Sequence, residues 1–375
     1  MLNKLPDFAL ERYFARWEFR ARHLLCASDV EALSLTDLLD LADDECRAHW
    51  RDLKLGYTES AGHPLLRAEI ASLYQRITPD EALTFAGAEE AIYVLMNVLL
   101  GAGDHAIVAW PAYQSLHEVA RGTGAEVDLL ELDENRGWAL DLNALQRLLR
   151  PTTRLIVVNF PHNPTGALPD RETFGALVDM ARYAGCWLLS DEVYRGLEYS
   201  DSHRLPAACD VYEHGISLGV MSKAYALAGL RVGWIACRNA EMLKRLAAFK
   251  DYTTICNSAP SEILALIALR ARDTLLARSR TIVAGNLVHL DRFFREWSGV
   301  FEWARPRAGS VAFPELVATL PIEHFAAELV EREGVLLLPG GVFGHSGNHF
   351  RLGFGRSDLP LALEGLERFA KLQFR

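Results

Sequence analysis

Residues 153–194 read TRLIVVNFPHNPTGALPDRETFGALVDMARYAGCWLLSDEVY and contain an apolar run, a turn, a helical pattern and a second apolar run. The two runs, 153–160 and 186–190, are short and rich in Val, Ile and Leu, as is typical of strands that are buried on both faces. The residues between them, 170–184, have the spacing of an amphipathic helix. This order predicts two parallel strands joined by a crossover helix.

The same alternation continues on both sides of this unit. Five further apolar runs are predicted strands: 82–86, 105–109, 125–130, 215–221 and 231–237. Further helical patterns lie at 64–77, 88–100, 113–122 and 141–149. Alternating strands and helices predict an α/β fold, with a mostly parallel sheet as the middle of a three-layer α/β/α large domain.

The pattern changes near residue 280, where a long helical stretch at 281–297 is followed by shorter strands and helices. This change predicts a smaller α+β domain at the C-terminal end. We expect three parts: residues 1–45 as an N-terminal arm that also contributes to the small domain, 46–280 as the large domain and 281–375 as the small domain.

Composition limits the classes of function. The chain has 375 residues, half of them hydrophobic, and a formal net charge of −10, which argues against nucleic acid or an anionic membrane as the main partner. Six cysteines without CxxC spacing indicate reduced thiols and no zinc site, and we expect no metal. The sequence shows no signal peptide and no apolar run of membrane-spanning length, so we expect a cytoplasmic protein.

One lysine stands apart from the others. The chain has six lysines, and five of them have charged or polar neighbours and look like surface residues. Lys223 instead follows the apolar run 215–221, at the end of a predicted strand. Ligands of parallel α/β sheets bind at the carboxyl ends of the strands, and a desolvated lysine favours the neutral, nucleophilic amine.

Other chemically useful groups follow other predicted strands. Gly87, Ala88 and Glu89 open a helix and could cradle an anion, or simply form a tight turn. Tyr113 could stack on a flat ligand or belong to the core. Asn163 lies in a rigid turn, and its bond to Pro164 is a candidate for a cis peptide.

The remaining strand ends carry charged or hydroxyl groups. Asp191 follows the predicted strand at 186–190, and Tyr194 comes three positions later. A buried acid at this position either has a charged partner or caps the next helix. Ser222 precedes Lys223, and Arg231 could clamp an anion. Taken together, the strand ends would suit a planar, phosphorylated heteroaromatic aldehyde.

The motifs NFPHNPTG (159–166), SDEVY (190–194) and SKAYALAGLRVGW (222–234) occur in the order and rough spacing of a known family. The chain resembles the fold type I pyridoxal-phosphate enzymes, the aspartate aminotransferase superfamily, over about residues 57–356. GYTESAGHPLLRAEIA (56–71) and FRLGFGR (350–356) add to the resemblance.

The resemblance implies pyridoxal 5′-phosphate as the cofactor. Lys223 would form its Schiff base and move a proton during catalysis, and Asp191 would pair with the protonated pyridine nitrogen. Tyr194 and Asn163 would bond the phenolic oxygen of the ring, Asn163 would also lie beside the substrate, and Tyr113 would stack on the ring.

The resemblance also assigns the phosphate and the substrate carboxylate. The phosphate would be held by Gly87, Ala88, Glu89, Ser222 and Arg231. Tyr57 would reach the phosphate of a neighbouring subunit, which implies a homodimer with shared active sites. Arg351 would grip the α-carboxylate of the substrate, where the alternative is a surface ion pair.

The sequence departs from the family pattern in three places. Val220 replaces a hydroxyl residue three positions before the lysine, and Glu89 puts an acid in the phosphate cradle, so we expect its side chain to point away. The stretch HLLCASDVEALSLTDLL (23–39) lacks the Gly-Glu-Pro-like pattern of many relatives and resembles the corresponding part of capreomycidine synthase, a family member that cyclises a hydroxyarginine.

The expected activity is that of a PLP-dependent aminotransferase, which moves the amino group of an α-amino acid to a 2-oxo acid. The alternative is a PLP-dependent lyase, acting by β- or γ-elimination or as a C–S lyase, or a capreomycidine-synthase-like cyclase that uses the same residues. An aminotransferase-like DNA-binding regulator is disfavoured by the acidic charge, and a nicotinamide dehydrogenase by the lack of a G-x-G-x-x-G turn. The motifs do not identify the amino acid.

Overall fold

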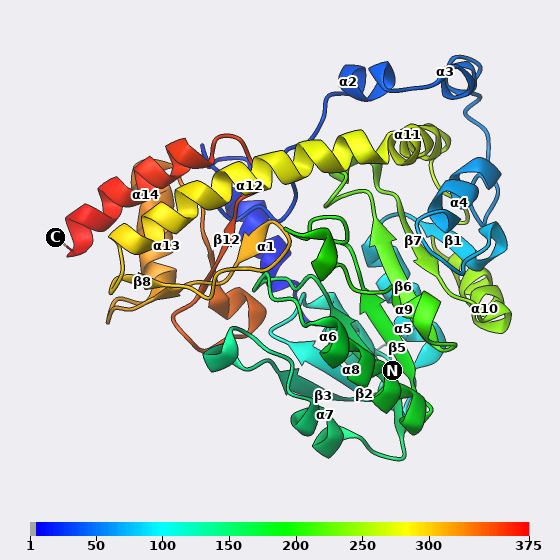
Figure 1. Ribbon diagram of the computed structural model, residues 1–375, viewed down its shortest axis with the longest axis horizontal. Helices are drawn as coiled ribbons and strands as arrows, with labels where there is room; N and C mark the ends of the chain where they lie inside the picture. The colour runs from blue at the N-terminus through cyan, green and yellow to red at the C-terminus, as the bar shows by residue number, and fades with distance from the viewer. Residues whose placement is uncertain (1–4, 375) are drawn as a thin grey trace.

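The computed structural model describes residues 5–374, and its larger part is built on a seven-stranded sheet (Figure 1). The strands are β1 (Ala82–Phe85), β2 (His105–Trp110), β3 (Glu126–Glu131), β4 (Thr153–Asn159), β5 (Trp187–Asp191), β6 (Gly215–Val220) and β7 (Gly233–Ala236). Their order in the sheet is β1-β7-β6-β5-β4-β2-β3. Strand β7 runs opposite to the other six strands of this sheet, so the predicted mostly parallel sheet is confirmed.

Helices cover both faces of the sheet. One layer contains α5 (Ala88–Leu99), α6 (Ser115–Gly122) and α10 (Ala240–Lys250), and the other contains α7 (Leu142–Leu148), α8 (Arg171–Ala184) and α9 (Ala208–Val211). Strand β4 shows why its sequence is apolar throughout: Leu155 and Val157 pack in the core beneath α5, whereas Ile156 and Val158 pack in the core beneath α8. The three-layer α/β/α arrangement is therefore confirmed.

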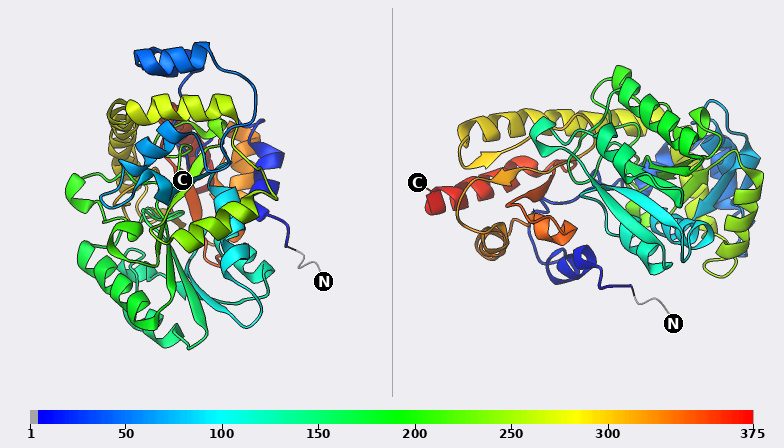
Figure 2. Two further views of the ribbon diagram at one scale, coloured as in Figure 1. Left: turned by 90° about the vertical axis from the view of Figure 1, so that its right-hand side faces the viewer. Right: turned by 90° about the horizontal axis from the view of Figure 1, so that it is seen from below.

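The C-terminal residues form a smaller part beside the sheet, and the long helix α12 (Arg272–Glu296) spans the two (Figures 1 and 2). Its elements are β8 (Phe301–Glu302), β9 (Val311–Ala312), β10 (Glu315–Leu316), α13 (Ile322–Glu333), β11 (Leu338–Pro339), β12 (Phe350–Gly353) and α14 (Leu359–Phe374). Strands β11, β12 and β9 form one antiparallel sheet, and β10 pairs with β8.

The N-terminal segment joins this smaller part. Helix α1 (Ala9–Trp17) lies against the short 3-10 helix η5 (Gly340–Phe343). Farther along, His23 bridges to Val335, and the Gly353 N–H donates to the Leu25 carbonyl at 3.0 Å. By contrast, α2 (Leu35–Asp40) and α3 (Asp44–Arg51) pack against α11 (Ala259–Arg270) of the larger part.

The remaining elements are α4 (Pro64–Ala71) and the 3-10 helices η1 (Pro79–Glu81), η2 (Glu134–Arg136), η3 (Asp201–His203) and η4 (Ala228–Leu230). The helix predicted over 64–77 therefore ends at Ala71. The Asp210 carboxylate accepts hydrogen bonds from the backbone N–H groups of Gln75 and Arg76 at 2.9 to 3.0 Å, so these groups bond a side chain outside the helix. A tertiary contact decides this helix end.

Helix α12 (Arg272–Glu296) begins well before the predicted start at residue 281. Its first turns carry arginines that bond other elements: Arg278 donates to the Glu31 carbonyl at 2.7 Å, and Arg280 to the Gly196 carbonyl at 2.7 Å. Because these turns are held by polar contacts, their sequence lacks the apolar spacing by which a helix is recognised. The expected domain boundary at 280/281 falls inside α12, and the three-part division stays a prediction.

A helix that spans a membrane must be both long and apolar. Among residues 5–374, no helix combines the length and the apolar character needed to cross a bilayer.

Candidate active site

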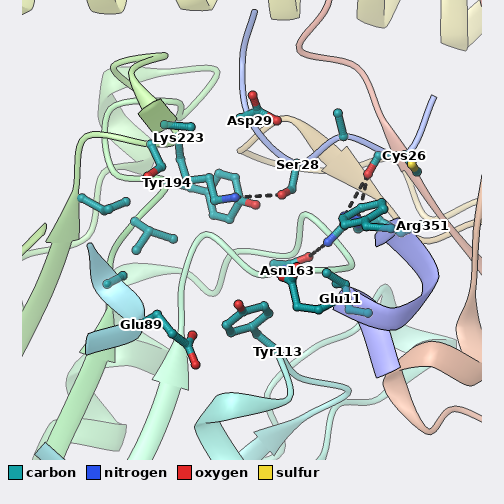
Figure 3. Close-up of a pocket in the computed structure, with 18 of the residues that line it drawn as sticks. Glu11, Cys26, Ser28, Asp29, Glu89, Tyr113, Asn163, Tyr194, Lys223 and Arg351 are labelled. Atoms are coloured by element: carbon teal, nitrogen blue, oxygen red, sulfur yellow. Dashed lines mark hydrogen bonds between the residues drawn. The ribbon is translucent and has the colours of Figure 1, made fainter. Parts of the chain in front are cut away.

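A cavity of about 460 Å³ opens at the carboxyl ends of β4, β5 and β6, where the sheet meets the smaller part (Figure 3). Ten of the predicted site residues line it: Ala88, Glu89, Tyr113, Asn163, Asp191, Tyr194, Ser222, Lys223, Arg231 and Arg351. Gly87 lies directly beneath Arg231. Tyr57 is elsewhere, with 90% of its side chain exposed, beside a separate hollow that includes His49.

Lys223 lies just after β6, on the floor of the cavity. Its Nζ donates to the Ser28 hydroxyl at 2.8 Å (Figure 3). Burial, opposed by the attraction of Asp29 and reinforced by the positive charge of Arg351, lowers the pKa of Lys223 to about 8. About a tenth of the amine is therefore neutral and nucleophilic at pH 7, far more than for an ordinary lysine.

The prediction that the other five lysines lie at the surface is wrong for Lys250, while Lys4 lies outside the described residues. Lys250 is fully buried, and its Nζ donates to the Ser60 carbonyl at 2.6 Å and to the Asn257 side chain at 3.0 Å. Burial lowers its pKa. The residues next to Lys250 in the sequence are polar, so no local pattern indicated that this lysine is buried and hydrogen-bonded inside the protein.

Asp191 is the last residue of β5 and pairs in register with Asn159 of β4. Its side chain is buried and accepts a hydrogen bond from the Val193 N–H at 3.1 Å. Burial raises the pKa of Asp191 to about 7, although Lys223 partly offsets the effect. A buried carboxylate of this kind is stabilised by a cationic partner, such as a protonated ring nitrogen.

This burial predicts that Asp191→Asn stabilises the cofactor-free protein at pH 8. The folded-state pKa is raised, so the charged form destabilises the fold, and wild-type stability falls as the pH rises from about 4 to about 7. A rise from 3.8 to about 7 corresponds to at most about 4 kcal/mol of unfolding free energy, which the variant regains. Urea denaturation at pH 5 and pH 8 measures the difference in unfolding free energy between the variant and the wild type, with the exposed Asp7→Asn variant as the control. A difference that does not depend on pH would contradict the assignment.

Asn163 and Arg351 meet at the opposite side of the cavity. The Asn159 side chain accepts a hydrogen bond from the Asn163 N–H at 2.8 Å, which holds the turn after β4, and three X–Pro bonds, including Asn163–Pro164, are cis. Arg351, on β12, is 1% exposed. It donates to the Asn163 side chain at 3.2 Å and to the Cys26 carbonyl at 2.9 and 3.1 Å.

The setting of Arg351 excludes a surface ion pair. No carboxylate among residues 5–374 lies within ion-pair distance of its guanidinium, so its charge is balanced by neutral acceptors only. A buried guanidinium without a counter-ion is a strong site for a carboxylate ligand.

The end of the cavity near α5 is built for a small anion. Gly87 has φ +87°, and a Cβ at this position would lie 2.6 Å from Arg231 Nη2. Ala88 and Glu89 at the start of α5, Ser222 and Arg231 all line this cavity, and backbone N–H groups, a hydroxyl and a guanidinium are donors that suit a phosphate. Val220 lines the cavity without offering a hydroxyl.

Glu89 does not occupy this anion site with its carboxylate. The Ser115 hydroxyl, at the start of α6, donates to it, and Figure 3 shows the side chain directed away from Lys223 beside Tyr113. Burial raises the pKa of Glu89, and hydrogen bonds from Ser115 and Tyr113 oppose the rise.

Two tyrosines complete a slot for a flat ligand. The Tyr113 ring borders the cavity and packs against Phe8, with ring centroids 5.3 Å apart. The Tyr194 hydroxyl is buried and has no hydrogen-bond partner among the described residues. A buried hydroxyl in this state fits a ligand oxygen.

The sequence motifs missed the residues that close the cavity from the N-terminal side. Cys26, Ser28 and Asp29 approach Arg351 and Lys223, and Glu11 and Glu18 come from α1 and its C-terminal end. A weak signal was present in the FRLGFG motif. A Cβ on Gly353 would lie 1.8 Å from the Ala27 carbonyl oxygen, so this glycine lets the N-terminal segment pack on β12.

The fold and the cavity define a class of protein, and comparison with known proteins names it. Residues 25–362 match the family model "Aminotransferase class I and II". The chain belongs to this family.

Individual relatives cover nearly the whole chain. Capreomycidine synthase of Streptomyces vinaceus is 32% identical over 93% of this chain and 90% of its own length. An aspartate/prephenate aminotransferase of Thermus thermophilus is 31% identical over 85% of this chain and 83% of its own. The crystal structure of a PLP-dependent aminotransferase from Streptococcus suis superposes with a TM-score of 0.94, at 34% identity and 99% coverage of both chains.

The family uses pyridoxal phosphate, and the residues of the cavity fit it. The anion site between Gly87 and Arg231 suits its phosphate, and the buried Asp191 suits its ring nitrogen. The unpartnered Tyr194 hydroxyl suits its phenolic oxygen, and Lys223 is an amine for its aldehyde. The chain is therefore an enzyme of the PLP-dependent class I and II aminotransferase family.

Outside the cavity, one group of side chains has the composition of a metal site. Glu134, His345 and His349 offer ligand atoms within 4.8 Å of one another. The sequence predicted no metal. His349 Nε2 already contacts Glu134 at 2.8 Å, and His345 Nδ1 accepts from the Gly347 N–H at 3.1 Å, so we assign no metal here.

Proposed function

We propose that the protein is an aminotransferase that moves the amino group of an α-amino acid to a 2-oxo acid. The observation that carries the proposal is the pair of opposed cations, Lys223 and Arg351, which face one cavity (Figure 3). We infer that one ligand presents its α-carboxylate to Arg351 and its α-carbon to Lys223.

Each residue then has a defined task. Arg351 and Asn163 hold the α-carboxylate as a charge-assisted pair, and the Lys223 amine takes the proton from the α-carbon and returns it. Asp191 keeps a positive charge on the ring nitrogen, and Tyr194 bonds the ring oxygen. When bound, pyridoxal phosphate supplies the aldehyde that receives the amino group and an electron-withdrawing ring.

The cofactor itself is anchored at its phosphate. Gly87, Ala88 and Glu89 supply backbone at the start of α5, and Ser222 and Arg231 supply a hydroxyl and a guanidinium. Tyr113 covers one face of the ring. These assignments are supported by the lining of the cavity and, for Gly87, by its close approach to Arg231.

The test is visible absorption of the purified holoenzyme, followed during addition of amino acids without any oxo acid. Transamination predicts loss of the yellow band with a donor amino acid, release of one equivalent of its oxo acid, and recovery of the band when an acceptor oxo acid is added. A yellow band that persists during product release would contradict transamination.

A second candidate is cyclisation or elimination on an amino acid. It is favoured by the likeness to capreomycidine synthase, which extends over 93% of the chain, and by the Asp29 carboxylate close to Lys223. An acid beside the lysine could protonate a leaving group. In the same experiment, ammonia, pyruvate or a cyclic amino acid without any need for an oxo acid would establish this reaction.

We also propose a homodimer in which Tyr57 reaches the partner's phosphate site. The support is an exposed apolar patch, formed by Leu55, Tyr57, Tyr252 and Ile255, with exposed fractions from 50% to 90%. The two segments of the patch are joined by the Thr58 hydroxyl, which donates to the Asn257 carbonyl at 3.2 Å.

The dimer predicts a sedimentation mass of twice the chain. Tyr57→Phe removes only the hydroxyl and should weaken cofactor affinity about tenfold while the mass stays doubled. Tyr183→Phe, at an equally exposed tyrosine outside the patch, is the control. A monomeric wild-type protein would refute the shared site.

We further propose that the protein works in the cytoplasm. The support is that all six cysteines are free and five are buried, as expected in a reducing compartment. Fractionation of the source cells tests it, and recovery of the protein with membranes or in the medium would refute it.

A further inference from the structure

The side chain of a bound amino acid has only one direction to take in this cavity. In the proposed function the α-carboxylate is directed to Arg351 and the α-carbon to Lys223, and pyridoxal phosphate would occupy the space toward the sheet. The remaining wall is the N-terminal segment, formed by α1 and residues 24–29. Figure 3 shows Glu11 of this wall on the side of Arg351, and Asp29 above Lys223.

This wall is acidic. Glu11, Glu18 and Asp29 line the cavity, and two of them, Glu11 and Glu18, are seven positions apart and so lie on one side of α1 and its end. Neither the Glu11 nor the Glu18 carboxylate forms a hydrogen bond or an ion pair with another residue in the range 5–374. Burial raises the pKa of Glu18, and the charges of Glu11 and Asp29 add to the rise, so the three carboxylates lie within electrostatic reach of one another.

The positive charges of the cavity do not neutralise this wall. Lys223, Arg231 and Arg351 are directed to the cofactor and the α-carboxylate. Among the described residues that line the cavity, Arg356 is the one cation that remains, and its Nη2 lies 3.4 Å from the Asp29 carboxylate. Once cofactor and α-carboxylate are bound, three carboxylates face the side chain of the ligand against one arginine that is already paired.

The wall also contains apolar surface between its acids. Leu10 and Phe14 of α1 line the cavity, and Leu24 follows in the next segment. An aliphatic stem can lie against these residues while a positively charged end meets the carboxylates. Lysine- and arginine-like side chains have this combination of stem and charge.

We propose that the substrate class is α-amino acids with a cationic side chain, guanidinium or ammonium, read by Glu11, Glu18 and Asp29. The proposal rests on the proposed function in one respect, namely that Arg351 holds the α-carboxylate and Lys223 faces the α-carbon. It applies equally to amino transfer and to cyclisation. An aspartate- or glutamate-like side chain would instead meet like charge.

The test compares ligands that differ in charge and little else. The holoenzyme, without oxo acid, is titrated with L-arginine and its neutral isostere L-citrulline, with L-lysine and L-norleucine, and with L-glutamate. The apparent Kd is taken both from the cofactor absorption change and from calorimetry. We expect arginine and lysine to bind at least about tenfold more tightly than their neutral counterparts, and glutamate most weakly.

Variants locate the effect. Glu18→Gln and Glu11→Gln remove a charge at positions that make no structural contact, and each should reduce the arginine-to-citrulline ratio several-fold while citrulline affinity stays within about twofold. Glu364→Gln, on the exposed face of α14, makes the same charge change far from the cavity and should leave the ratio unchanged.

The outcomes separate this proposal from the function on which it rests. Equal affinity for arginine and citrulline, or tighter binding of glutamate, would overturn the substrate class while transamination stands. Tighter binding of glutamate would in addition make Arg356 the residue that reads an acidic side chain. Absence of binding by every amino acid tested would overturn both.

Discussion

Replacing Lys223 by alanine is expected to abolish covalent attachment of the cofactor and to reduce turnover by about 10⁴-fold, because the amine is both the nucleophile and the proton carrier at the α-carbon. Its Nζ is held at 2.8 Å from Ser28, and burial already lowers its pKa to about 8. The variant should bind pyridoxal phosphate only reversibly, so that dialysis removes the cofactor from the variant and not from the wild type.

The fold should survive this change. The folded-state pKa of Lys223 lies below its ordinary value, so the charged amine destabilises the fold and its removal should not lower the unfolding temperature of the cofactor-free protein. Lys244→Ala, at an exposed lysine of α10, serves as the matched control and should behave like the wild type. Turnover by the Lys223 variant within tenfold of the wild-type rate would overturn the assignment.

Replacing Arg351 is expected to produce the second large effect, confined to the substrate. Its buried guanidinium has only neutral partners, Cys26 and Asn163, so the α-carboxylate of the substrate is the partner that its charge lacks. Arg351→Ala should raise the apparent Kd for amino acids by about 10²- to 10³-fold, the range measured when one partner of a buried charge pair is removed. Affinity for pyridoxal phosphate should change by less than about threefold, because the phosphate site is at the other end of the cavity.

A second variant keeps this prediction independent of folding. Arg351→Lys retains the charge but loses the two-pronged geometry, and should give an intermediate loss of amino-acid affinity with a stable fold. Arg368→Ala, which breaks a surface pair with Glu333, is the control for loss of an arginine. Unchanged amino-acid affinity in both Arg351 variants would show that this residue has a structural role only.

The strands and the groups that follow them were predictable because both are local features. A strand buried on both faces needs an uninterrupted apolar run, and Asp191, Asn163 and Lys223 follow such runs directly. The carboxyl ends of parallel strands meet at one edge, so groups that are separated in the sequence lie together. The exceptions were local patterns altered by distant contacts, such as the helix end at Ala71 that Asp210 determines.

The N-terminal wall of the cavity, formed by α1 and residues 24–29, could not be predicted from local sequence patterns. Ser28 and Lys223 are separated by 195 positions, and Cys26 and Arg351 by 325. Nothing near Glu11 or Glu18 in the sequence marks them as residues of a cavity, because their amphipathic helix could equally pack against the core. Their position depends on how the N-terminal segment docks on β12.

The sequence by itself determined the sheet, its crossover helices, the family and the cofactor, since each depends on periodicity or on residues that are neighbours in the chain. Only the tertiary structure decided which N-terminal groups close the cavity, that Arg351 is buried without a counter-ion, and that three carboxylates face the space left for the substrate side chain. The physical reason is that these features arise from the packing of two parts of the molecule on each other. Such packing depends on complementary surfaces of the whole fold, which no short pattern contains.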